Sequence, residues 1–460
     1  MRDLFVTLVV FGSLPLILRK PFFGVLVGTW LGLMNPHILC WSFAAGRPFA
    51  FIVAVTLIMS FLISKEPKRL PASGLVGLLA FWWFWLFVTT LTAFYPEAAW
   101  TYWDRAWRIM LLTFLTIALL TSRERIDALV WICVISLGFY GVKGGIFTLL
   151  GGGANHVNGP AGTFIGGNNE VGLALVMTIP LIRYLQLTST NRWVKYALMA
   201  AMGLCVVAVL GTQSRGALLG LLVMILYLAL KSRNRAGLLL LLALSLPVAL
   251  MIMPESWYNR MDTIQEYSQD ASALGRINAW WTAWYVALDH PFVGGGFNMF
   301  QRPTFIQYAP DPRNVRDVHS IYFQALGQQG FVGLFTFLGI MFGSLISLNR
   351  LSKFARSHEQ LQWIGDLSSM VFVSIIGYAT SGAFLGLSMF DYYYTLVAIT
   401  IGLTAVARGY AAQAVPKIAE VAARPPSAVA VPAVGAGFNR FVPPRRRLLG
   451  VDVAGWFAKL

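Results

Sequence analysis

The chain consists largely of apolar runs that are long enough to enter a membrane. They occur at about 4–18, 22–34, 49–63, 72–91, 107–121, 127–150, 171–187, 194–211, 216–231, 236–253, 320–347, 366–387 and 392–408. Every backbone N–H and C=O inside hydrocarbon must be paired, so each run should be a helix. The first two runs are short and could be two spans, a re-entrant hairpin or one broken span. We therefore predict an all-α integral membrane protein with roughly 12 or 13 transmembrane helices.

The charged residues are too few to cover a water-exposed surface. They make up 12% of the chain, with 57% hydrophobic residues, whereas a soluble domain has about 25% charged residues. A net charge of +16 would suggest nucleic acid in a soluble protein. Here Lys and Arg lie in short loops between apolar runs, as the positive-inside rule expects, so no nucleic-acid partner is predicted.

Basic clusters follow alternate apolar runs and define one side of the membrane, which should be the cytoplasm. The clusters are Arg19-Lys20; Lys65, Lys68 and Arg69; Arg123 and Arg125; Arg192 and Lys195; Lys231, Arg233 and Arg235; Arg350, Lys353 and Arg356; and Arg408. The opposite, periplasmic side then receives the segments 95–105, 151–169, 212–215, 254–318 and 388–391.

This alternation divides the chain into four parts. Residues 1–253 and 319–410 are predicted to be transmembrane helices, 254–318 a periplasmic loop, and 411–460 a cytoplasmic, mostly disordered tail. Within the loop, residues 271–288 have few helix breakers and predict a helix that His290-Pro291 ends. The basic run 445–447 in the tail favours anionic membrane lipids.

Three residues on the periplasmic side are candidates for chemistry. Arg215 is a cation on the side that disfavours cations, and an Arg at membrane depth usually has a partner or a ligand; snorkelling to lipid headgroups is the alternative. Arg276 precedes Trp280 by four residues, so one helix face presents a cation beside an aromatic ring, although an ordinary interfacial helix would look the same. His319 lies where the loop re-enters the membrane and could take a proton from a hydroxyl, but a lone His at a helix start is more often structural.

Together these three residues suit phosphate chemistry. Two guanidinium groups provide permanent, bidentate phosphate recognition, and one imidazole provides a general base. The set fits displacement of a pyrophosphate leaving group by a hydroxyl. The sequence has no DxD-like acidic pair on this side to support a metal-bound nucleotide sugar, so neither a metal nor a cofactor is predicted.

Four further residues are second-tier candidates. Lys143 lies among glycines near the periplasmic end of its run, where snorkelling explains it equally well. Arg313 and Arg316 closely precede His319 and could line an entrance or belong to a solvated loop. Tyr322 shares the helical face of His319.

Three stretches of the chain resemble the O-antigen ligase and polymerase superfamily, bacterial membrane glycosyltransferases that use undecaprenyl-pyrophosphate-linked glycans. They are Ser214-Arg215-Gly216, the segment from Gly275-Arg276 to Gly294-Gly-Gly296, and the segment from His319-Ser320 to Gln329-Gly330. The N-terminal run 28–41, with Met34-Asn-Pro-His37, looks like a branch of O-glycosylation ligases associated with exosortase systems. Many relatives have Asn where Ser320 stands and Glu where Gln329 stands, which leaves the acceptor open.

The resemblance implies a GT-C-type helical fold and metal-independent transfer of a whole glycan, with inversion at the anomeric carbon. Arg215 and Arg276 would match the family's phosphate-binding arginines, and His319 its catalytic histidine. We therefore expect an O-antigen ligase in the bacterial inner membrane that moves undecaprenyl-pyrophosphate-linked polysaccharide onto lipid A–core oligosaccharide at the periplasmic face. A polymerase and a protein O-oligosaccharyltransferase with a protein acceptor are the alternatives within this chemistry. A lipid-linked glycan transporter is the alternative from another class, although paired inverted halves would then be expected.

Overall fold

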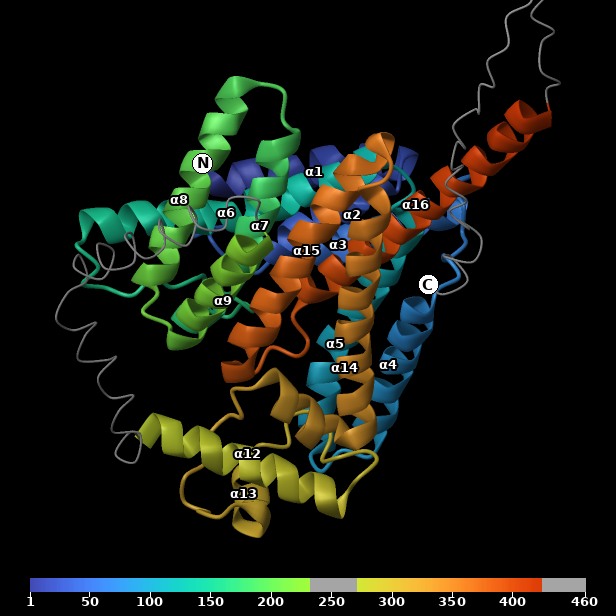
Figure 1. Cartoon of the computed structure of the whole chain (residues 1–460). Helices are drawn as coiled ribbons and strands as arrows, with labels where there is room; N and C mark the ends of the chain where they lie inside the picture. The colour runs from blue at the N-terminus through green and yellow to red at the C-terminus, as the bar shows by residue number, and fades with distance from the viewer. Residues whose placement is uncertain (232–270, 424–460) are drawn as a thin grey trace, which may run out of the picture.

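The computed structural model describes residues 1–231 and 271–423, and in this part of the chain all regular elements are helical (Figure 1). The helices are α1 (Arg2–Arg19), α2 (Phe22–Leu33), α3 (Phe49–Ile63), α4 (Gly74–Leu91), α5 (Pro96–Leu119), α6 (Arg123–Leu150), α7 (Asn168–Thr188), α8 (Arg192–Gly211), α9 (Arg215–Lys231), α12 (Ala271–Asp289), α13 (Arg302–Tyr308), α14 (Ile321–Ala355), α15 (Gln362–Ser381) and α16 (Asp391–Ala423), with short 3-10 turns η1 (Glu359–Leu361) and η2 (Gly382–Phe384). The predicted run 236–253, the loop before residue 271 and the tail beyond residue 423 lie outside the described residues.

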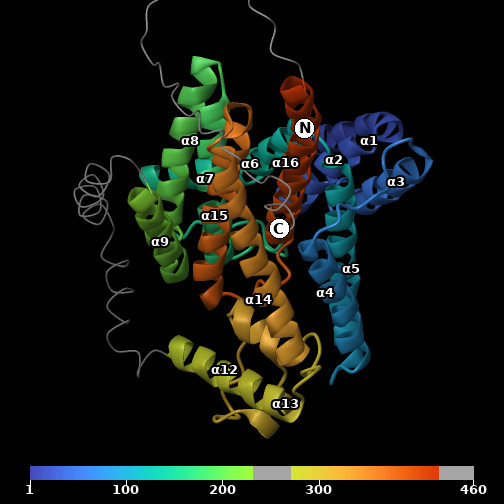
Figure 2. The same cartoon turned by 45° about the vertical axis from the view of Figure 1, so that its right-hand side comes forward.

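Most helices form a bundle, and α12 lies across one end of it. Figure 2 shows α4, α5, α14, α15 and α16 running in roughly the same direction, with α12 and α13 below the lower end of α14. The helix predicted at 271–288 is therefore confirmed as α12. The buried centre of the bundle is aromatic: Tyr378 and Tyr393 stack with ring centroids 4.4 Å apart, and the indole of Trp82 donates to the Tyr394 hydroxyl at 2.9 Å.

Within the described residues, seven helices are long and apolar enough to cross a membrane. They are α4, α6, α7, α8, α14, α16 and the unit formed by η1, α15 and η2. The helices α2, α3 and α9 are apolar but shorter, and α5 carries Asp104, Arg105 and Arg108 near its middle. A many-helix membrane protein is confirmed, whereas the count of 12 or 13 spans stays a prediction.

The described parts of the five segments that charge alternation assigned to the periplasm meet at one face of the bundle. Asn168 Nδ2 donates to Thr212 O at 2.8 Å, and Gln213 Nε2 donates to Gly153 O at 3.0 Å. Phe94, which directly precedes the segment 95–105, donates its N–H to Gly295 O at 3.0 Å, and Ser388 N donates to Gln324 Oε1 in the first turn of α14 at 2.9 Å. Loops that are far apart in sequence therefore build one surface, which we call the loop face.

Basic loops meet in the same way at the other end of the bundle. Arg125 forms an ion pair with Glu66 at 2.6 Å, and its Nη1 donates to the carbonyl of Leu119 at 3.0 Å. Arg408 donates to the carbonyl of Ala72 at 2.6 Å. The separation of loops by charge that the sequence indicates is thus reproduced by their packing, and we call this end the basic face.

The longest helix, α14, is broken at Gly330, where φ is +68°. The break frees backbone groups that must find partners inside the bundle. The turn that follows α12 supplies most of them, since Gly295 N and Gly296 N donate to the carbonyls of Gly327 and Gln328 at 2.8 and 2.9 Å, and Phe331 N donates to the carbonyl of Pro291 at 2.8 Å. The carbonyl of Gln329 accepts from the Trp85 indole at 3.0 Å. Two glycine-rich stretches singled out from the sequence are therefore one structural unit, which we call the turn–kink junction.

Replacing Gly330 with Ala should destabilise the protein. A Cβ at this position would lie 2.2 Å from the carbonyl oxygen of Phe292, in a backbone conformation that side chains rarely adopt. We expect a loss of about 1–3 kcal/mol, measured as a lower midpoint of thermal unfolding of the purified protein in detergent. Gly339→Ala on the same helix is the control, because its Cβ would meet Leu78 at an ordinary 3.6 Å. Equal unfolding of both variants and the wild type would contradict the assigned role of the junction.

Candidate functional site

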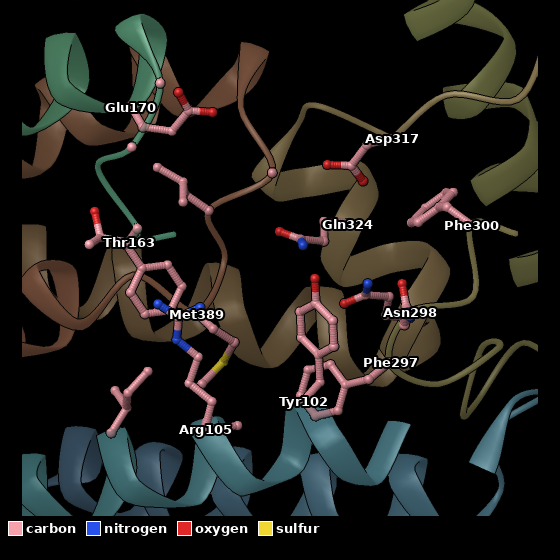
Figure 3. Close-up of a pocket in the computed structure, with 18 of the residues that line it drawn as sticks. Tyr102, Arg105, Thr163, Glu170, Phe297, Asn298, Phe300, Asp317, Gln324 and Met389 are labelled. Carbon is pink, nitrogen blue, oxygen red and sulfur yellow. The ribbon is translucent and has the colours of Figure 1, made fainter. Parts of the chain in front are cut away.

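The loop face contains a cavity of about 410 Å³. Its walls come from α5, from the segment before α7 and the first turn of α7, from the loops 297–300 and 315–317, from α14 and from the loop 386–389. Figure 3 shows this cavity with side chains from all sides turned towards its centre. Its size falls within the range of ligand pockets, roughly 300–1,000 Å³.

Polar groups of both charges line this polar cavity. Figure 3 shows the carboxylates of Glu170 and Asp317 on opposite sides, with the Gln324 amide between them and the Tyr102 hydroxyl directed upwards beneath it. Gln324 is held in place because its Oε1 accepts a hydrogen bond from Ser388 N. Arg105 enters from α5, and its guanidinium carbon lies 3.5 Å from the centre of the Phe164 ring. A ligand here would meet both hydrogen-bond donors and acceptors.

His319 lies beside the polar cavity among four charged side chains. Burial is the largest influence and lowers the pKa of His319, the carboxylates of Asp317 and Glu170 raise it, and the guanidinium groups of Arg276 and Arg316 lower it. Glu170, Asp317 and Arg316 also line the cavity. Because the net shift is below the ordinary value of about 6.5, the imidazole is neutral near pH 7 and can accept a proton.

The helix α12 is tied to the segment that leads to His319. Asn278 donates to the carbonyls of Asp311 and Asn314 at 2.9 and 3.0 Å and accepts from Asp311 N at 2.9 Å. Trp280 donates to the carbonyl of Val318 at 2.8 Å, and its ring stacks on Phe323 at 5.1 Å. Arg276 is one turn before Trp280 on the same helix. These contacts bring Arg276 and His319 into one neighbourhood, as the sequence predicts.

Arg215 reaches the loop face from the start of α9. The residues on either side of it are fixed there: Thr212 accepts from Asn168 at the start of α7, and Gly216 packs against Phe384 of η2. In turn, Gly382 of η2 packs against Ile321, which follows His319 by two residues. These contacts place the start of α9, and with it Arg215, on the same face as Arg276 and His319.

Three residues near this site have a left-handed backbone, which is uncommon outside glycine. They are Gln213, Asn298 and His319, with φ of +52°, +58° and +41°. Gln213 is two residues before Arg215, and Asn298 lines the polar cavity. Such strain costs energy and clusters at functional sites, so its occurrence here supports a functional role for this region.

The second-tier candidates have different surroundings. Arg316 lines the polar cavity, and its side chain packs against the backbone of Gly275. Tyr322 donates to the carbonyl of Ala379 at 2.8 Å, so its hydroxyl holds α14 to α15. Lys143 and Arg313 are exposed and are not part of the cavity wall.

Several cavity residues do not stand out in the sequence. The residues around Glu170 are typical of a helix cap, yet α7 has no side-chain cap hydrogen bond, and the Glu170 carboxylate lies over Gly167. Gln324 lies within an apolar run and carries no charge to reveal it. Arg105 is a cation on the side that disfavours cations, so the reasoning applied to Arg215 could have found it.

Helix ends add positive potential at the loop face. The helices α7, α9 and α14 begin here, and neither α7 nor α14 has a side-chain cap that occupies its first N–H groups. Unsatisfied N–H groups at helix N-termini favour anions. Arg215, Arg276 and Arg316 strengthen this preference. Among the described residues no cluster of three or more His, Cys, Asp or Glu side chains could hold a metal ion.

The fold and the site thus define a many-helix membrane protein with a polar cavity, lined by groups of both charges, at one face. Residues 200–338 match the family model described as O-antigen ligase, and residues 1–190 match a family of unknown function (DUF5935). No curated protein matches the chain. The match over residues 200–338 confirms the resemblance to the O-antigen ligase and polymerase superfamily that the sequence motifs indicate.

Proposed function

We propose that the protein is an O-antigen ligase that transfers polysaccharide from undecaprenyl pyrophosphate to lipid A–core oligosaccharide. The observation that supports this most is the position of His319, which lies beside Arg276 and Arg316 at a polar cavity in the region that matches the family. We further propose that the fold is GT-C-type and that the loop face is directed to the periplasm from the bacterial inner membrane.

In the proposed reaction His319 removes the proton from an acceptor sugar hydroxyl. The oxygen attacks the anomeric carbon of the donor glycan from the side opposite the carrier, and the bond between that carbon and the phosphate oxygen breaks. Undecaprenyl pyrophosphate leaves with the electron pair, and the configuration at the anomeric carbon is inverted. No step uses a metal or a cofactor.

The arginines would hold the pyrophosphate and stabilise the charge that develops on it. Arg276 and Arg316 lie near His319, and Arg215 reaches the same face beside the start of α7. Guanidinium groups that are already fixed in place need little reorganisation when the bond breaks. The carboxylates of Glu170 and Asp317 raise the pKa of His319, whereas the arginines lower it. The carboxylates would therefore stabilise the imidazolium that forms when His319 accepts the proton.

The donor half of the reaction would be the same in a polymerase or a protein O-oligosaccharyltransferase, since these differ in the acceptor. We favour the ligase because residues 200–338 match the model described as O-antigen ligase, and a side-by-side acceptor assay distinguishes the three. A lipid-linked glycan transporter is less well supported, because the cations near His319 gather at one face of the bundle, whereas a transporter would place ionisable groups near the membrane midplane.

Substitution of the proposed base should abolish transfer without unfolding the protein. His319→Gln is expected to lower kcat about 10²- to 10⁴-fold, the usual contribution of a general base. Arg276→Lys keeps the charge but loses the bidentate fork, and it should lower kcat/KM by roughly 10- to 100-fold. The assay measures glycan transfer from purified lipid-linked donor to rough lipopolysaccharide. Arg302→Ala, an exposed arginine of α13, is the matched control and should retain full activity. Full activity of His319→Gln would remove His319 from the mechanism.

The pH dependence of transfer should report the protonation of His319. Burial lowers its pKa, so kcat/KM should rise with pH as the ring loses its proton, with an acidic limb at lower pH than that of an ordinary imidazole. The Asp317 carboxylate raises the pKa of His319. Asp317→Asn should therefore move the acidic limb of the profile to lower pH, while Glu97→Gln, an exposed substitution on α5, should leave it in place. A shift to higher pH in Asp317→Asn would contradict this account.

A further inference from the structure

A second cavity lies on the other side of Arg105. It has a volume of about 600 Å³ and is formed by α2, α3 and α5, with two contributions from α16. Most of its wall is apolar, including Leu31, Val53, Leu57, Ile58, Leu111, Leu112 and Leu115. We call it the apolar groove. Almost all of it belongs to residues 1–190, the part that matches a family of unknown function.

The groove extends from the loop face towards the basic face. Its wall on α5 runs from Asp104 to Thr116, which is about 18 Å along a helix. On α2, Gly32 packs beside the Asp391 carboxylate at the loop face, while Phe22 lies 5.4 Å from the Arg125 guanidinium at the basic face. Its length is close to half of a hydrocarbon core of roughly 30 Å. The groove therefore has the length and polarity for a chain that lies in one leaflet.

Gly28 of α2 leaves space for an occupant, whereas Gly24 and Gly32 pack closely against Leu57 and the Asp391 carboxylate. Gly24, Gly28 and Gly32 are spaced four residues apart and share one face of the helix. A Cβ on Gly28 would have Leu112 as its sole neighbour within 4 Å among the described residues, at an ordinary 3.6 Å. His37 also lines the groove, and its Nδ1 is buried with no hydrogen-bond partner in the described part of the chain.

The apolar groove and the polar cavity share part of their walls. Arg105, Ile109 and Phe164 line both. Arg105 stacks on Phe164 and interacts electrostatically with Asp391, and it remains accessible to solvent. Figure 3 shows Arg105 at the edge of the polar cavity. A molecule with an apolar chain and a phosphate at one end could therefore occupy both spaces, with its phosphate at Arg105.

We propose that the apolar groove binds the first part of the donor's polyprenyl chain and that Arg105 contacts the phosphate nearest to that chain. This rests on the proposed function, and it assigns a role in donor binding to residues 1–190. A polyprenyl chain gains little from moving out of lipid into the groove, since both are apolar. The groove would instead fix the direction of the chain, and Arg105 would supply a charge-assisted contact to the phosphate.

The test uses the full-length protein in nanodiscs and undecaprenyl phosphate without a glycan as the probe, with binding measured by native mass spectrometry. Gly28→Leu fills the groove and should weaken binding about tenfold or more. Arg105→Gln should weaken it to a similar extent while leaving the groove open. Gly203→Leu is the matched control, because Gly203 is exposed on α8 and a Cβ there would meet no atom of the described residues within 4 Å. It should bind as the wild type does.

A transfer assay separates this proposal from the proposed function. For Gly28→Leu, the KM for a donor with a long polyprenyl chain should rise about tenfold. The KM for a donor with a two-isoprene chain should not change, and neither should kcat with either donor. If Gly28→Leu and Arg105→Gln both transfer glycan with the KM of the wild type, the polyprenyl chain does not bind in the apolar groove, while the proposed function stands. If the wild-type protein binds undecaprenyl phosphate saturably, Gly28→Leu weakens this binding and the protein transfers no glycan, the result would support lipid binding in the apolar groove and contradict the proposed function. Equal displacement of the probe by phosphatidylglycerol would show a general lipid site and contradict the proposal.

Discussion

The break in α14 at Gly330 determines how the loop face is built, because backbone groups freed inside a membrane protein must be paired. The glycine turn after α12 provides the partners through Gly295 and Gly296. Docking of this turn fixes the end of α12, and Asn278 and Trp280 on α12 then hold the segment before His319. A hydrogen-bonding requirement in one helix thus positions a side chain that is eleven residues away in sequence.

The electrostatic balance at the loop face follows from this arrangement. Arginines and helix N-termini make the surface attractive to anions, while Glu170 and Asp317 keep the imidazole of His319 from becoming too weak a base. Burial has the largest effect on the pKa of His319 and keeps its ring neutral. A site with this balance can hold a diphosphate and accept a proton within the same small volume.

The sequence predicted the elements of the fold better than the contacts between them. Apolar runs located α2 and α3 closely, and the scarcity of helix breakers located α12. Basic clusters predicted which loops share a face, because the charge of each loop can be counted along the chain without knowing how the helices pack. Glu170 and Gln324 could not be predicted as cavity residues, since their direction depends on how distant helices pack. The number of spans could not be predicted either, because helices such as α2 are shorter than a bilayer and α5 carries three charged residues near its middle.

The central claim is that a lipid-linked pyrophosphate binds at the loop face beside His319, with its carrier directed towards the N-terminal helices. Cryo-electron microscopy of the full-length protein with undecaprenyl pyrophosphate tests this most directly. The account predicts diphosphate density in contact with Arg276 next to His319, continuous with chain density between α2 and α5. Diphosphate density at the basic face, for example between Lys353 and Arg356, would contradict it.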